Sequence, residues 1–331
     1  MIRYFFSFIS ILHFYSLEVF FIFILLFFYK KVIESISALE NIMKITITGS
    51  SGYLGKDLTP TLLKKGYDIN KLQRDEGSKH YWNPQKKILS QNLIDNSEII
   101  INLSGERIIK PFARKKSSEI ISSRIDSTGT LIDAIKNSKN PPKLIISASA
   151  CGFYGNRPNE LIDESSPKGR GEIPDIVNNW ESIQILEKTR VVFLRFGTII
   201  DKDSQIYKYM KKYSSVIGVS RIGDGENYFP WISKTDAIRA IHHIIENNNI
   251  NGPINIVSTK PITFKELISE INSEINPIIK FSIPKFAVSI LFGKFGKEIL
   301  LTNQKVLPRK LKETGFNWMN STPSGSIRLT R

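Results

Sequence analysis

Apolar and polar residues follow two different periods along most of the chain. Residues 44–48, Lys-Ile-Thr-Ile-Thr, have the β-branched content of a buried strand. Leu54, Leu58 and Leu62 then recur at helical spacing until Gly66, a residue that commonly ends helices. This segment therefore predicts a strand, a tight turn and a helix.

The alternation of strand and helix continues downstream. We expect further strands at 67–72, 98–103, 143–149 and 190–196, with helices within 116–136 and 175–188. Repeated strand–helix units imply an α/β fold, a Rossmann-like, doubly wound parallel sheet whose ligand lies beyond the carboxyl ends of the strands.

The first 42 residues differ in kind from the rest. Phe, Ile and Leu dominate them, and Lys30 and Lys31 close the apolar stretch. A membrane-spanning helix needs about 20 predominantly apolar residues, but the uninterrupted run 19–29 is too short. We expect translation to start at Met43. Two alternatives stay open: a membrane anchor whose lysines hold the next domain in the cytoplasm, and a signal peptide, although no clear cleavage site follows.

Composition narrows the function classes. The single cysteine, Cys151, allows neither an intrachain disulfide framework nor a multi-thiolate metal site, and it favours a reduced, cytoplasmic setting. The formal charge of +15 could attract a polyanion. The basic residues are scattered, however, without the aromatic-interleaved strand of RNA-binding domains. We therefore expect a small-molecule partner and neither nucleic acid nor metal.

Glycines follow the first strand at three-residue spacing, as Gly49, Gly52 and Gly55. Such a turn lets the backbone approach a pyrophosphate, and the N-terminus of the next helix offers free N–H groups and partial positive charge. The context predicts a dinucleotide site, with a purely structural turn as the alternative.

Arg74 stands where the second predicted strand ends. In dinucleotide-binding folds an acidic residue there binds the ribose hydroxyls of NAD, whereas an arginine can pair with the 2′-phosphate of NADP. Arg74 therefore favours NADP, the alternative being a solvated side chain. Polar or small residues end two later strands, at 102–105 and 147–149, and they suit either a cofactor groove or close packing.

With these pieces in order, the chain resembles the extended short-chain dehydrogenase/reductase superfamily, and within it the sugar-nucleotide-epimerase-like branch called epimerase family proteins. The matching stretches are ITGSSGYLG, INLSGE, SSRIDST, SASACGFYG, NNWE, LRFGTII, IGDGENYFPWIS and LLTNQKVLPRKLKETGF. The last of these resembles the small C-terminal domain of this branch. The resemblance divides the chain into an N-terminal extension (1–42), an NAD(P)-binding Rossmann-like epimerase domain (43–258), a small C-terminal domain (259–320) and a tail (321–331).

The resemblance also implies a set of residues that contact NADP. They are Gly49, Gly52, Tyr53, Leu54, Gly55, Arg74, Leu103, Ser104, Glu119, Arg124 and Ile199. Arg124 is chemically the most persuasive of those on the later elements, because a cation offsets phosphate charge. Glu119 is either its partner or a solvated side chain.

The catalytic assignment departs from the family pattern. Extended-family epimerases use a Tyr-x-x-x-Lys pair on the helix before the fifth strand, where the tyrosine exchanges a proton while nicotinamide exchanges hydride. This chain has no tyrosine there; Trp180 lies nearby and the next lysine is Lys188. Ser149, which matches the family's catalytic-strand serine, and Tyr154 are the remaining catalytic candidates, with packing or substrate contact as the alternative for Tyr154.

The substrate side is less determined. An aromatic, glycine-containing segment is suited to covering a ligand or to core packing; it includes Arg221, Gly223, Gly225, Tyr228, Phe229 and Trp231. Ser233 replaces a histidine usual in the family. We expect Asp236 to be a structural acceptor and His242 and His243 to be structural. The leading hypothesis is an NADP-binding oxidoreductase-like protein acting on an unidentified substrate, for which a nucleotide sugar is one candidate. A non-catalytic NADP(H)-responsive regulator is the alternative, because the Tyr-x-x-x-Lys pair is absent; some relatives are labelled cell-division inhibitors.

Overall fold

The computed structural model describes residues 26–31, 42–105, 117–182, 186–213, 217–288, 290, 298 and 300–329. The chain divides into two compact units, residues 1–43 and 44–331. In the first unit, residues 26–31 are helical, and the remainder of the predicted hydrophobic extension lies almost wholly outside the described residues. None of the helices in the described ranges has the length and apolar character needed to cross a membrane.

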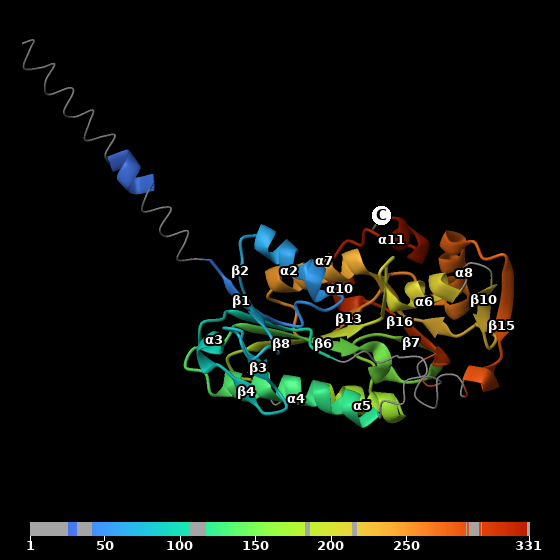
Figure 1. Cartoon of the computed structure of the whole chain (residues 1–331), viewed down its shortest axis with the longest axis horizontal. Helices are drawn as coiled ribbons and strands as arrows, with labels where there is room; N and C mark the ends of the chain where they lie inside the picture. Colours follow the sequence, from blue (N-terminus) through green and yellow to red (C-terminus); the bar gives the residue numbers. More distant parts are fainter. Residues whose placement is uncertain are drawn as a thin grey trace, which may run out of the picture. The chain divides into compact units, whose positions relative to one another are not determined.

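A six-stranded parallel sheet forms the centre of the second unit, in the order β13-β8-β6-β5-β1-β2 (Figure 1). Its strands are β1 (Lys44–Thr48), β2 (Asp68–Leu72), β5 (Ile99–Asn102), β6 (Leu144–Ala150), β8 (Arg190–Phe196) and β13 (Gly252–Ile256). The five strands predicted from the hydrophobic pattern are confirmed. The sixth, β13, was not predicted, because it is short and begins with Gly252 and Pro253, two residues that are depleted in strands.

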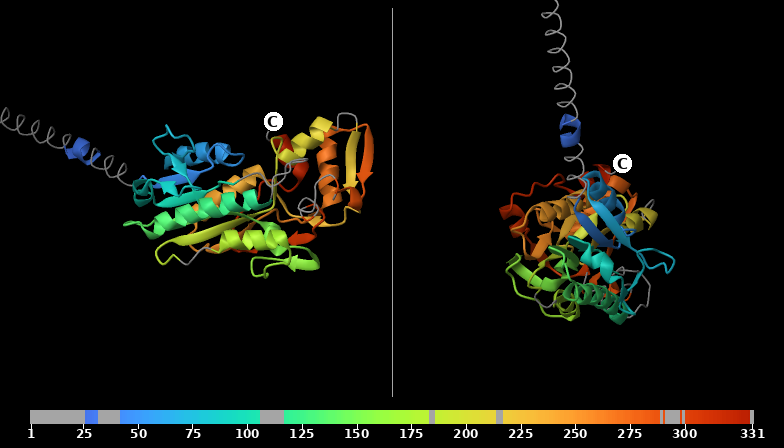
Figure 2. Two further views of the ribbon diagram at one scale, coloured as in Figure 1. Left: turned by 60° about the horizontal axis from the view of Figure 1, so that its bottom comes forward. Right: turned by 90° about the vertical axis from the view of Figure 1, so that its left-hand side faces the viewer.

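Helices cover both faces of this sheet, which confirms the doubly wound architecture. α2 (Gly55–Lys64) and α7 (Lys234–Glu246) lie on one face, and α3 (Gln91–Asp95), α4 (Ser117–Lys136) and α5 (Glu172–Glu181) lie on the other (Figures 1 and 2). Ile100 and Ile145 of the strands pack with Leu131 of α4, and Leu58 and Leu62 of α2 are also buried. This burial of both sheet faces explains why the strand segments read as nearly continuous apolar runs.

A small domain is built from elements in the later part of the chain, between residues 205 and 329. It contains α6 (Gln205–Tyr213), β10 (Ile217–Ile222), α8 (Phe264–Ile275), β15 (Ile279–Ile283) and α11 (Pro323–Leu329), and β10 pairs with β15 in parallel. Its core includes Tyr207, Leu267, Ile271 and Ile327. Segments from both sides of residue 259 therefore build this domain.

The remaining described elements are short. They are β3 (Trp82–Asn83), β4 (Ile88–Leu89), the 3-10 turn η1 (Cys151–Tyr154), β7 (Arg157–Ile162), β9 (Thr198–Ile200), β11 (Tyr228–Phe229), β12 (Trp231–Ser233), β14 (Ile262–Thr263), β16 (Gln304–Val306) and α10 (Arg309–Glu313). Two of them matter for the site, because η1 follows the carboxyl end of β6 and β9 follows that of β8.

Candidate functional site

The glycine turn between β1 and α2 is closely packed against the end of β5. Gly49 has φ of +71°, and a Cβ there would lie 2.8 Å from the backbone carbonyl of Leu103. A Cβ on Gly55 would lie 2.1 Å from the carbonyl oxygen of Gly49. Both positions therefore require glycine: the first for its left-handed backbone and both for the close approach.

This turn exposes donors where α2 begins. The Gly52 amide donates to the Gly49 carbonyl at 2.9 Å, which closes the turn. The amides of Tyr53 and Leu54 donate to no other atom of the described chain, and no side chain caps the helix. Free amides at the start of a ten-residue helix form an anion site, so the residues present fit the pyrophosphate of a dinucleotide.

Arg74 follows the end of β2 and is exposed. Its guanidinium lies 5.0 Å from the ring centroid of Trp82, a buried residue of β3, and partial burial lowers the pKa of Arg74. Stacking on the indole orients the guanidinium while leaving its edge open to a ligand. The structure thus places Arg74 one strand away from the glycine turn.

The end of β5 is held by a buried polar network. Asn102 accepts from Thr48 Oγ1 at 2.7 Å, and its amide donates to Ser147 Oγ at 3.3 Å. The Ser104 amide donates to Thr48 Oγ1 at 3.2 Å. These bonds fix Leu103 and Ser104 directly beside Gly49, so the structure brings these predicted contact residues together.

Arg124 of α4 reaches the same edge of the sheet. Its guanidinium carbon lies 4.5 Å from the ring centroid of Trp180, and it fills the space beside Gly105. Arg124 Nε and Trp180 Nε1 are buried and have no hydrogen-bond partner within the described residues. Burial lowers the pKa of Arg124 to about 10. Buried donors without acceptors are rare in native proteins, so this pair is suited to an oxygen-rich ligand.

Two predicted contact residues are less informative. The Glu119 side chain lies outside the described residues. Ile199 is partly buried in β9 and is paired with Ile232 of β12. Neither residue makes a described contact with the glycine turn.

Sequence reasoning missed an ionic cluster that joins this turn to the segment after β9. The Tyr53 hydroxyl donates to Asp201, and Lys234 Nζ lies 3.3 Å from the same carboxylate and 4.3 Å from the Tyr53 ring centroid. Asp57 also pairs with Lys234. Burial, then the Asp201 hydrogen bond, raises the pKa of Tyr53. The three segments are far apart in the sequence, and no local pattern signals their contact.

Ser149, near the carboxyl end of β6, is engaged by a buried ion pair. Its hydroxyl donates to Glu181 Oε1 at 2.5 Å. Arg195 of β8 donates to both oxygens of the same carboxylate, at 2.9 Å from Nε and 2.6 Å from Nη2. Sequence reasoning missed Glu181 and Arg195, although Glu181 belongs to the NNWE stretch.

Tyr154 is fully buried at the end of η1. Its hydroxyl donates to Asn255 Oδ1 at 2.7 Å and accepts from Arg195 Nη1 at 2.9 Å. Burial raises the pKa of Tyr154 well above its usual value, although Arg195 opposes this shift. The hydroxyl is therefore occupied inside the core, and the geometry favours packing for Tyr154. Arg195 nevertheless links it to Ser149.

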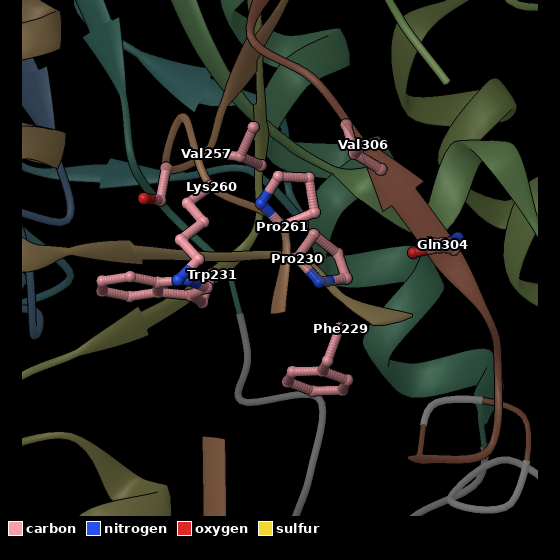
Figure 3. Close-up of a pocket in the computed structure, with 9 residues that line it drawn as sticks. Phe229, Pro230, Trp231, Val257, Lys260, Pro261, Gln304 and Val306 are labelled. Carbon is pink, nitrogen blue, oxygen red and sulfur yellow. The ribbon is translucent and has the colours of Figure 1, made fainter. Parts of the chain in front are cut away.

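The substrate-side segment is largely packed. Phe229 and Trp231 are buried, and with Val257, Ser258 and Gln304 they line a cavity of about 10 Å³ (Figure 3). That volume holds about one water molecule, so this cavity is too small for a substrate and lies apart from the glycine turn. A larger groove of about 240 Å³ is lined by Asn156, Pro158, Asp224, Glu226, Asn227, Lys285, Leu301 and Asn303.

The polar residues at the start of α7 are structural, as expected. Ser233, which replaces the usual histidine, caps the helix by accepting from the Asp236 amide at 2.9 Å. Asp236 is buried and accepts from the amides of Met319 and Asn320. His242 contacts Thr61 Oγ1 through Nε2 at 2.8 Å. Among the described residues, no cluster of three potential metal ligands occurs.

Comparison with known proteins agrees with this geometry. Residues 45–172 match the model of the NAD dependent epimerase/dehydratase family, and residues 283–322 match that of a domain of unknown function, DUF1731. The epimerase family protein SDR39U1 homolog, chloroplastic, of Arabidopsis thaliana is 28% identical over 302 residues, which cover 87% of each chain.

Solved structures show the same fold. The human epimerase family protein SDR39U1 (isoform 2), crystallised with NADPH, superposes with a TM-score of 0.77 at 24% identity, over 87% of this chain and 98% of the human one. The UDP-glucose 4-epimerase of Thermotoga maritima, crystallised with UDP-glucose, gives a TM-score of 0.64 at 15% identity, over 86% and 96% of the two chains.

Proposed function

We propose that this protein binds NADP(H) and exchanges hydride with a nucleotide-linked sugar, because residues 45–172 match the NAD dependent epimerase/dehydratase family and residues 283–322 match DUF1731. The human relative of the same fold was crystallised with NADPH, and the Thermotoga enzyme with UDP-glucose. These ligands give the chemical class from which a substrate search starts.

The observation that carries the proposal is the glycine turn with its unpaired amides. Tyr53 and Leu54 would donate to the pyrophosphate at the start of α2. Arg74 would pair with the 2′-phosphate of the adenosine ribose, one strand away at β2. Neighbouring strands lie about 4.8 Å apart, so the carboxyl ends of β2 and β6 are separated by about 14 Å. A dinucleotide that starts at Arg74 and crosses the turn would thus place its nicotinamide towards Ser149.

The bound cofactor would accept or donate the hydride, and the chain would supply binding and orientation. Leu103 and Ser104, fixed beside Gly49, would contact the cofactor between the turn and β6. Arg124 and Trp180 offer the unpaired donors of the α4–α5 side to ligand oxygens. A substrate hydroxyl beside Ser149 would accept or donate a hydrogen bond there.

The first experiment is a fluorescence titration with NADPH and NADH. A charge-assisted hydrogen bond contributes about 1.5–3 kcal/mol, so Arg74→Glu is expected to weaken NADPH binding by at least tenfold and to leave NADH binding nearly unchanged. Lys79→Glu, an exposed change of equal charge in the same segment, is the control. Equal NADPH affinity in Arg74→Glu and the wild type would refute the NADP assignment.

One observation favours the alternative, a non-catalytic NADP(H)-responsive regulator. α5 carries neither a tyrosine nor a lysine, so the usual acid–base pair is absent from that helix. The two functions differ in one measurement: incubation with NADP⁺ and UDP-sugars produces NADPH or an epimerised sugar only if the protein is an enzyme.

We also propose a cytoplasmic location, which the single buried cysteine supports. The alternative is attachment to a membrane through the apolar residues 1–42. Fractionation of cells expressing the full chain and residues 43–331 distinguishes them, because an anchor would bring only the full chain down with the membranes.

A further inference from the structure

Glu181 has a position that its sequence context does not suggest. It is the last residue of α5, and its side chain is only 8% exposed. It accepts one hydrogen bond from Ser149 and two from Arg195, whose side chain is 4% exposed. A carboxylate bound by the two donors on one edge of a guanidinium is fixed in direction, so the Ser149 hydroxyl proton has a defined acceptor.

This arrangement also fixes the orientation of Arg195. Its remaining Nη1 donates to the Tyr154 hydroxyl, and its guanidinium lies 3.5 Å from the ring centroid of Phe153. The charges of Arg195 and Glu181 cancel each other. The Ser149 hydroxyl donates its proton to Glu181. The lone pairs of Ser149 Oγ then remain for a donor on a ligand, such as a substrate hydroxyl.

The network lies where the nicotinamide is expected. Ser149 stands two residues beyond Ser147, which contacts Asn102 at the end of β5. Arg195 is the register partner of Ser149 on β8. The pair is therefore at the carboxyl edge of the sheet, with Ser149 two strands and Arg195 three strands from β1. It borders the helix that carries the acid–base pair in other extended-family enzymes.

Other titratable side chains nearby are less suited to proton transfer. The Tyr154 hydroxyl is engaged with Asn255 and Arg195. Cys151 is buried, its thiol donates to the Arg195 carbonyl at 3.3 Å, and burial raises its pKa. Of the described groups here, only Glu181 combines a negative charge with a direct bond to Ser149.

We propose that Ser149 and Glu181 replace the missing tyrosine–lysine pair as a proton relay, with Arg195 as the residue that positions it. This inference rests on the proposed NADP(H)-dependent function. As the substrate C–H bond breaks, its electron pair leaves as hydride to the nicotinamide of NADP⁺. The substrate O–H bond breaks at the same carbon, its proton passes to Ser149 Oγ, and the Ser149 proton passes to Glu181. The products are a carbonyl group and NADPH, and the reverse reaction returns both protons.

A charge series tests whether the ion pair borders the nicotinamide, and it needs no substrate. The nicotinamide of NADP⁺ carries one positive charge more than that of NADPH. Glu181→Gln leaves Arg195 uncompensated, so NADP⁺ binding is expected to weaken about tenfold relative to NADPH binding. Arg195→Gln leaves the Glu181 carboxylate without its cation, so NADP⁺ binding is expected to strengthen relative to NADPH binding. The double variant Glu181→Gln/Arg195→Gln returns the ratio towards that of the wild type.

Titrations of both cofactors against these variants give the answer. Glu172→Gln, the same substitution at the opposite end of α5, is the control and leaves the ratio unchanged. Each single variant leaves one buried charge unpaired, whereas the double variant leaves none. Either single variant that folds is sufficient for the test, because each is expected to shift the ratio in its own direction while the double variant keeps the ratio of the wild type. An unchanged ratio in all three variants overturns the placement. A wild type that binds neither cofactor instead overturns the proposed function.

The relay itself is tested by single-turnover oxidation of UDP-glucose and related UDP-sugars by bound NADP⁺. Ser149→Ala and the double variant are expected to slow hydride transfer by about 10²–10⁴-fold, with NADPH affinity preserved. Normal transfer in the folded double variant overturns the role of Glu181. The proposed relay also fails if the variants change the ratio of cofactor affinities as expected but the wild type transfers hydride from none of these sugars.

Discussion

At the scale of single residues, the close packing of the turn between β1 and α2 depends on the absence of side chains at its glycines. Gly49 needs both its left-handed backbone and the absence of a Cβ, because the Leu103 carbonyl lies within 2.8 Å of that position. Gly55 has no positive φ, and its requirement is steric alone. The three-residue spacing shows that the turn is tight. It does not show that β5 presses against it, because that contact joins segments about fifty residues apart.

Gly55→Ala tests this packing. The new methyl group would meet the Gly49 carbonyl oxygen at 2.1 Å, and overpacking of this kind costs about 1–3 kcal/mol. The turn must widen, so we expect lower thermal stability and NADPH affinity reduced at least tenfold. Gly129→Ala is the control: nothing lies within 4 Å of its Cβ position in α4, and alanine there should stabilise the helix by up to about 1 kcal/mol. Equal behaviour of the two variants in thermal melts and titrations would contradict the steric argument.

At the scale of elements, the pattern of apolar and polar residues predicted the strands that position the candidate site. The prediction succeeded because buried parallel strands are apolar runs and helices are amphipathic. It failed where side chains meet across elements. Nothing near Asp201 indicates that Lys234 and Tyr53 approach it, and nothing near Glu181 indicates Arg195. Charged residues in a sequence are usually solvated, so their burial as pairs becomes visible only in three dimensions.

The contact between α2 and α7 makes stability depend on pH. Burial, followed by the Lys65 charge, lowers the pKa of His242, whose ring contacts Thr61. The folded state thus holds His242 neutral, while the unfolded chain binds a proton near pH 6.5. Its contribution to stability is present above that pH and is lost as pH falls through the lowered folded pKa.

We therefore expect the melting temperature to fall between pH 7 and pH 5, and His242→Gln to reduce this dependence. Burial also lowers the pKa of His243, so part of the dependence remains in the variant. His80→Gln, which changes a histidine away from this contact, should leave the curve unaltered. Thermal melts across the pH range decide the matter: a slope that is the same in His242→Gln and the wild type would exclude His242 as its source.

At the scale of the whole molecule, the residues proposed to bind the cofactor and substrate lie along one edge of the six-stranded sheet, from β2 to β8. The small domain is connected to it through non-local segments, since α6 and β10 precede β13 in sequence whereas α8, β15 and α11 follow it. Trp231 of β12 and Ile200 of β9 also belong to the core of the small domain. The shared core predicts that residues 44–331 unfold as one cooperative unit.

Ligand-linked stability tests this view and the cofactor assignment together. A ligand that binds only the folded state at 100 times its Kd stabilises it by about 2.7 kcal/mol. An unfolding entropy of about 2.1 cal/mol/K per residue over residues 44–331 means that each kcal/mol raises the Tm by roughly 1.5–2 °C, so NADPH should raise the Tm by about 4–5 °C. NADH at the same concentration should act less, because it lacks the phosphate that Arg74 would bind. Calorimetry should show a single transition that moves as a whole. Two transitions, of which NADPH moves only one, would mean that the small domain unfolds independently of the cofactor groove.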